Sequence, residues 1–73
     1  MISNVTYDLI NSMATKYVPD TQHEELHVIS RDAWVELVVD LVNKGLIKPK
    51  LSSLLKCALK WEELLTTKYS RLN

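Results

Sequence analysis

The sequence predicts a small, mainly α domain of three helices, and three observations support this fold class. Apolar residues recur at intervals of three and four in three segments, which is the period of an amphipathic helix. The single glycine and the two prolines stand between these segments rather than inside them. The chain has 73 residues, which is too short for a second core. We therefore treat 1–73 as a single domain.

The first helix is predicted from about Asn4 to Lys16. Ser3 or Asn4 can accept the hydrogen bond that caps its first turn. It must end near Val18, because Pro19 disfavours helical geometry at the residue before it. The side chains expected to face the core are those of Val5, Tyr7, Leu9, Ile10, Met13, Ala14 and Tyr17.

The segment 20–30 admits two interpretations. Residues 21–26 can form one helical turn capped by Asp20. Residues 26–29 can instead form a short strand, because Val28 and Ile29 favour the pleated conformation. If this strand forms, pairing of 26–29 with 46–48 would make a two-stranded β ribbon, which needs helices packed against it to be stable.

The second helix is predicted between Ser30, as its N-cap, and Lys44. Gly45 suits the left-handed position that follows a helix, and Leu46 would then contact Leu41 in a Schellman ending. The apolar side chains of this helix span an arc of about 200°, twice what a surface helix needs. These are Trp34, Val35, Leu37, Val38, Val39, Leu41 and Val42.

So wide an arc indicates a central helix. One interpretation is that the other helices and the linking segments cover all of it. The other is that a flank near Val35 and Val39 stays exposed and contacts a segment of a partner.

The third helix is predicted after Pro49, from Leu51 or Ser52 to about Tyr69. Glu62 falls within its apolar stripe by angle, either at the edge with its carboxylate in water or as a buried carboxylate with a partner. The stripe consists of Leu51, Leu54, Leu55, Ala58, Trp61, Leu65, Tyr69 and Leu72.

Charge is divided between the two parts of the chain, although the net charge is zero. Residues 1–43 hold two basic and seven acidic side chains, a net −5, whereas 44–73 hold seven basic and two acidic, a net +5. The two parts can attract each other within the fold. Alternatively, a basic face from Lys44 to Arg71, with Lys56 and Lys60 opposite the apolar stripe, meets phosphates or an acidic protein surface.

The string His23-Glu24-Glu25-Leu26-His27 matches H-E-x-x-H, the zinc motif of metal-dependent hydrolases. The motif needs a helix, and Pro19 leaves little room for one upstream. A third ligand is also needed, and Cys57 is the one candidate downstream. The lone Cys57 has no histidine or acid beside it in sequence that would make it a nucleophile. We therefore predict no metal, no cofactor and no enzymatic activity. A metal-dependent hydrolase is the weakest of the three functions considered for this chain.

The second helix, the 45–50 turn and the third helix resemble a helix-turn-helix in outline. The third helix would then read DNA, but its opening Leu51-Ser52-Ser53-Leu54-Leu55-Lys56 is largely apolar. Ser52, Ser53, Lys56 and Lys60 are the side chains that could contact DNA. A small DNA-binding repressor is therefore the alternative function.

The chain as a whole, from Met1-Ile2-Ser3-Asn4-Val5 to Tyr69-Ser70-Arg71-Leu72-Asn73, resembles the small early regulators of Xanthomonas lytic phages that bind host RNA polymerase. The resemblance implies docking on the amino-terminal part of the polymerase β′ subunit, near the RNA exit channel and emerging RNA. It further implies inhibition of initiation and readthrough at terminators. Because the resemblance includes no shared motif, it assigns no functional residue in this chain.

The leading prediction is therefore a non-enzymatic interaction protein, with Val35, Val39, Lys56 and Lys60 as candidate partner-binding residues. No basic segment followed by an apolar run lies near Met1, and no apolar run approaches the ~20 residues that span a bilayer. We expect a monomer in the cytoplasm, the host bacterial cytoplasm if the protein is phage-encoded, without membrane contact.

Overall fold

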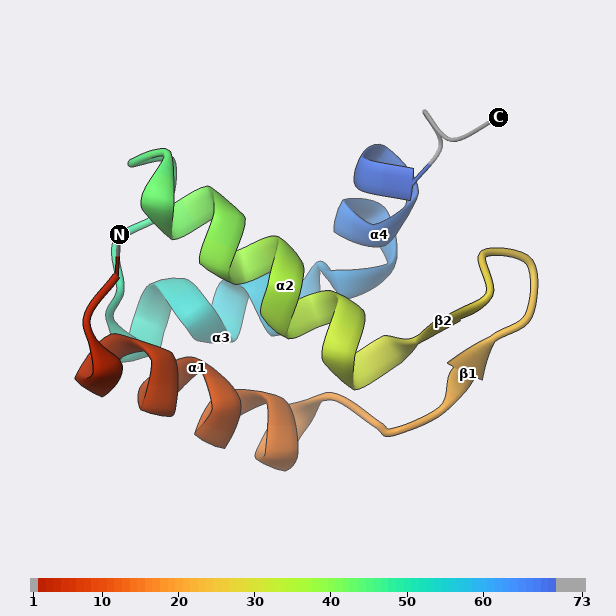
Figure 1. The fold of residues 1–73 in the computed structure, drawn as a ribbon, viewed down its shortest axis with the longest axis horizontal. Helices are drawn as coiled ribbons and strands as arrows, with labels where there is room; N and C mark the ends of the chain where they lie inside the picture. Colours follow the sequence, from red (N-terminus) through yellow and green to blue (C-terminus); the bar gives the residue numbers. More distant parts are fainter. Residues whose placement is uncertain (1, 70–73) are drawn as a thin grey trace.

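A computed structural model describes residues 2–69, with the side chains of 67–69 left out of the description. These residues form four helices and a two-stranded sheet, so the mainly α class is confirmed (Figure 1). In chain order the elements are α1 (Asn4–Tyr17), β1 (Gln22–His23), β2 (Val28–Ile29), α2 (Ser30–Asn43), α3 (Leu51–Leu59) and α4 (Trp61–Tyr69).

Helix α1 begins and ends close to where the sequence predicts. The Ser3 hydroxyl accepts a hydrogen bond from the Thr6 backbone N–H at 3.2 Å, which makes Ser3 the N-cap. At the other end, the carbonyl oxygen of Val18 accepts a hydrogen bond from Arg31 Nε at 3.0 Å. Arg31 thus ties the end of α1 to the first turn of α2.

The β ribbon forms, but with a different partner strand from the one predicted. Residues 28–29 pair antiparallel with 22–23, so that Gln22 lies opposite Ile29 and His23 opposite Val28. Pairing with 46–48 was the wrong expectation, for two reasons. The loop between β1 and β2 is short, and closing a short loop costs little entropy. The segment after α2 is meanwhile used to end that helix.

Helix α2 ends in the predicted Schellman motif. Gly45 has a φ of +73°, in the left-handed region, and its N–H donates to the Val42 carbonyl at 3.0 Å. The Leu46 N–H donates to the Leu41 carbonyl, also at 3.0 Å, which completes the pair of bonds that defines the motif. The start of α2 differs from the prediction.

Ile29, not Ser30, occupies the N-cap position of α2, and it makes no side-chain cap bond. Ser30 is buried as the first helical residue, and its N–H donates to the Thr21 carbonyl at 2.7 Å. The reason for the shift is the hairpin. It supplies a backbone acceptor for the Ser30 N–H, one of the N–H groups at the start of α2 that have no partner within the helix.

The predicted third helix is two helices, α3 and α4, with a break at Lys60 (φ −101°, ψ 17°). The break lets α3 pack on α1 while α4 packs on α2 (Figure 1). It also changes the angular position of Glu62, which is exposed in the first turn of α4, where the helix dipole favours a carboxylate. A buried Glu62 is therefore excluded.

The core lies around α2, which contacts α1, α3, α4 and β2. This position explains the wide apolar arc of α2. Leu51, a member of the predicted stripe, is outside the core, since its side chain is 60% exposed. The predictions for the Tyr69 side chain and for Leu72 fall outside the described part of the chain. The buried apolar residues are Ile10, Met13, Ala14, Val18, Ala33, Trp34, Val35, Leu37, Val38, Leu54, Cys57, Trp61 and Leu65.

Candidate functional site

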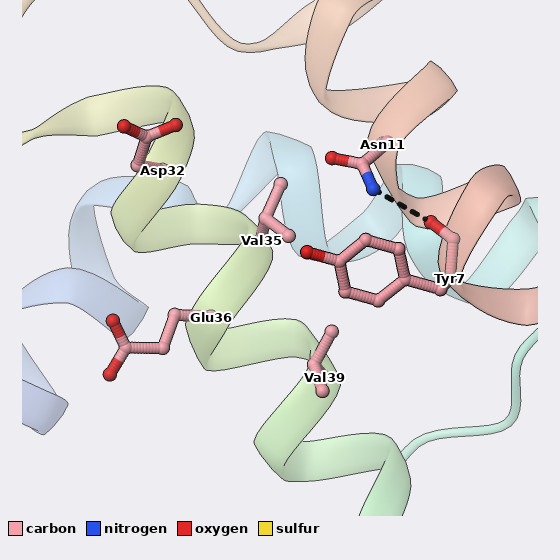
Figure 2. A pocket seen from close by; sticks show the side chains of 6 residues that line it. All are labelled: Tyr7, Asn11, Asp32, Val35, Glu36 and Val39. Atoms are coloured by element: carbon pink, nitrogen blue, oxygen red, sulfur yellow. Dashed lines mark hydrogen bonds between the residues drawn. The ribbon is translucent and has the colours of Figure 1, made fainter. Parts of the chain in front are cut away.

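A groove of about 290 Å³ lies between α1 and α2 (Figure 2). Its volume is close to the lower limit of ~300 Å³ for sites that take drug-sized molecules, so it suits one or two side chains of a partner. The lining residues are Tyr7 and Asn11 from α1 and Asp32, Val35, Glu36 and Val39 from α2.

Helical periodicity places these side chains in rows. Asp32, Val35 and Val39 are separated by three and four residues, and Tyr7 and Asn11 by four, so each set lies along one side of its helix. The close approach of α1 and α2 then brings the two rows face to face. The groove is therefore built from two regular helices rather than from loops.

The structure brings Val35 and Val39 together in this groove, but they are less exposed than predicted. Val35 is 9% exposed and counts as buried, and Val39 is half-buried. The physical reason is Tyr7, whose ring lies across the groove from the two valines and shields them (Figure 2). Tyr7 itself is 45% exposed.

The polar groups of the groove have a defined arrangement. The Asn11 side-chain amide donates to the Tyr7 carbonyl at 3.1 Å, and Figure 2 shows its side-chain oxygen turned toward α2. The Tyr7 hydroxyl points toward Val35. Asp32 is exposed and belongs to no ion pair within residues 2–69, whereas the Glu36 carboxylate extends away from Tyr7.

Sequence reasoning missed Tyr7, Asn11 and Asp32 as groove residues. Tyr7 carried a signal, because it lies on the apolar side of its helix and yet has a polar tip. Asn11 and Asp32 carried no such signal in the sequence, since both are polar residues at positions expected to face solvent. They become groove residues only because α1 packs against α2 at this register.

Lys56 and Lys60 lie elsewhere, because neither lines the groove. Lys56 is exposed on α3 and Lys60 is exposed at the turn that follows α3. The four predicted partner-binding residues therefore lie in two separate regions of the surface. Val35 and Val39 belong to the apolar groove, and Lys56 and Lys60 belong to a basic region. Arg71, the far end of the predicted basic face, lies outside the described residues.

The Lys44–Asp40 ion pair joins the acidic and basic parts of the chain. Lys44 Nζ lies 3.0 Å from an Asp40 carboxylate oxygen, one helical turn away. A second pair, Arg31 with Asp20 at 3.9 Å, lies within the acidic part. The Lys44–Asp40 pair is exposed, and the Arg31–Asp20 pair is long and has an exposed carboxylate, so each contributes little to folding, on the order of 0–1 kcal/mol.

The H-E-x-x-H string folds as a hairpin rather than a helix. His23 is in β1, and His27 ends the turn with a φ of +53°, so the two side chains do not share a helical face. Across residues 2–69, no three histidine, cysteine or acidic side chains are grouped closely enough to hold a metal ion. The helical zinc site that the string would specify is therefore not formed by this segment.

Cys57 is buried on α3. Burial raises the pKa of its thiol, and the nearby Lys60 ammonium offsets part of that rise. A thiol with a raised pKa is protonated at neutral pH, and the thiolate is the nucleophilic form. Cys57 therefore acts as a small apolar residue of the core.

Comparison of the chain with protein-family models, with curated proteins and with solved structures gives no match. Within the described residues, no helix combines the length and the apolar character that crossing a membrane requires. The groove and the two charged parts of the chain are therefore the features that bear on function.

Proposed function

We propose that this chain is a non-enzymatic interaction module that docks on bacterial RNA polymerase through the α1–α2 groove. The observation that supports docking is the groove itself, with valines at its centre and polar side chains at its margins. The resemblance to small phage regulators supports the choice of polymerase, with the amino-terminal region of β′ as the contact. Inhibition of initiation and readthrough at terminators are the expected consequences.

The composition of the groove favours a protein segment over a substrate. Its lining includes no histidine, the commonest general acid or base, and no cysteine or lysine. Its two carboxylates, Asp32 and Glu36, are exposed rather than enclosed in a site that excludes water. An apolar centre with a polar margin is instead the usual anatomy of a protein interface. Grooves between two helices commonly accept single anchoring side chains from a partner.

Binding to purified bacterial RNA polymerase tests this proposal. We expect Val39→Ser to weaken binding about tenfold, because a hydroxyl replaces half-buried apolar surface at the centre of the interface. The matched control is Val5→Ser, since Val5 is 79% exposed and lies outside the groove. Fluorescence anisotropy of the labelled protein measures both variants.

Two results would contradict the proposal: no binding of the wild type, or equal loss in the two variants. Duplex DNA, tested in the same assay, examines the repressor alternative. Retention that falls steeply with salt would support DNA binding in place of polymerase binding.

The basic part has its own test, which is the double variant Lys56→Glu with Lys60→Glu. Both side chains are exposed, so we expect the free energy of unfolding to change by at most about 0.5 kcal/mol per site. If emerging RNA passes this face, like-charge repulsion should lower terminator readthrough more than it lowers polymerase binding. In-vitro transcription across one intrinsic terminator, beside a binding assay at fixed salt, measures the two effects.

The control is Lys48→Glu with Lys50→Glu, which makes the same change of charge at two exposed positions before α3. Equal effects of the two double variants would assign the result to net charge rather than to position. Wild-type readthrough from the folded Lys56 and Lys60 variant would show that this face makes no functional contact.

A further inference from the structure

The walls of the α1–α2 groove fit a long side chain with an apolar stem. Val35 and Val39 form one wall, and the Tyr7 ring lies across from them (Figure 2). An aliphatic stem can pack on Val39, the less buried of the two valines. A planar cation at its end can stack on the aromatic ring, which attracts positive charge through its π face.

The polar groups of the groove are mainly hydrogen-bond acceptors. The Asn11 amide nitrogen is already used in its bond to the Tyr7 carbonyl, so the Asn11 side-chain oxygen is the group presented to α2. The Asp32 carboxylate is acceptor-only, and the Tyr7 hydroxyl can accept as well as donate. A ligand that fits this set must be rich in donors.

The electrostatic setting selects a cation. Both helices of the groove belong to the part of the chain with a net charge of −5. Asp32 has no cationic partner within residues 2–69, so its charge is available to a ligand. A cation at this point would gain an ion pair without breaking one.

We propose that the groove receives an arginine side chain of the partner protein. Arginine combines an aliphatic stem, a planar cation that stacks on aromatic rings and five N–H donors in one fork, which lysine does not. This inference deepens the proposed function, since it names the anchoring residue of the docked segment. It depends on the proposed function only for the identity of that partner.

The direct test titrates the isolated, isotope-labelled protein with two capped tripeptides, Ala-Arg-Ala and Ala-citrulline-Ala. Citrulline keeps the shape of arginine but removes the charge. We expect the arginine peptide to shift the backbone amide signals of Val35 and Val39 with a dissociation constant in the millimolar range. The citrulline peptide should bind about tenfold more weakly, and a lysine peptide should fall between the two.

Variants of the groove provide the second arm. Asp32→Asn and Tyr7→Leu should each weaken binding of the arginine peptide at least fivefold in variants that circular dichroism shows to be folded. The control is Asp8→Asn, which removes the same charge from α1 outside the groove. Equal binding of the arginine and citrulline peptides, or shifts that map away from the groove, would overturn the proposal, and the peptide comparison needs no variant to fold.

The polymerase assay separates this inference from the proposed function. If the arginine peptide binds in the groove and polymerase does not bind the protein, the proposed function fails and the arginine site stands. If polymerase binds equally to wild type, Asp32→Asn and Tyr7→Leu, the arginine site fails and polymerase binding stands.

Discussion

Trp34→Ala should unfold most molecules of the protein at room temperature. Trp34 is 0% exposed at the centre of the core, on the helix that every other helix contacts. Removing a buried tryptophan side chain costs about 3–5 kcal/mol, because apolar contacts are lost and a cavity is left. A single core of this size rarely supplies more than about 3–5 kcal/mol of stability, so the loss is comparable with the whole.

Trp34→Phe is the matched variant for this test. The indole N–H of Trp34 is buried and has no hydrogen-bond partner among the described residues. Phenylalanine keeps much of the apolar ring and removes that unsatisfied donor, so it should lose much less stability than alanine. Urea denaturation followed by circular dichroism gives both values, and an alanine variant with a wild-type midpoint would place Trp34 outside the core.

Leu54→Ala is expected to have the second-largest effect on stability. Leu54 is 0% exposed on α3, the helix that packs on both α1 and α2. Truncating a buried leucine costs about 2–5 kcal/mol. The control uses the same substitution on the same helix. Leu59 is 80% exposed, so Leu59→Ala should change the free energy of unfolding by no more than about 0.5 kcal/mol.

The pair tests the break between α3 and α4 as well as the core. In one continuous helix Leu59 would lie near the edge of the apolar stripe and would lose packing on truncation. Comparable losses in Leu54→Ala and Leu59→Ala, measured by thermal melts of both variants, would therefore contradict the two-helix arrangement.

The sequence determined where the helices begin and end more completely than how the elements pair and pack. The end of α1 before Pro19 and the Schellman motif at Gly45 were predicted, and Ser3 was one of two predicted caps, because each of these features depends on a few neighbouring residues. The central position of α2 was also predictable, since a helix with so wide an apolar arc must be covered on several sides.

The strand partner and the helix break were decided by tertiary structure. Residues 28–29 could pair with any nearby strand, and chain closure favoured 22–23. No glycine or proline marks the break at Lys60, so the apolar period continues through it. The break forms because α3 and α4 must reach different helices, which is a requirement of packing rather than of local propensity.

The candidate site shows the same division. The apolar excess of α2 made Val35 and Val39 candidates for an exposed flank, and both line the groove, although Val35 is buried there. Tyr7, Asn11 and Asp32 could not be chosen from the sequence, because each becomes part of the groove only when α1 and α2 meet at a particular register. Sequence periodicity fixes which residues share one side of a helix, whereas the packing of two helices fixes which sides meet.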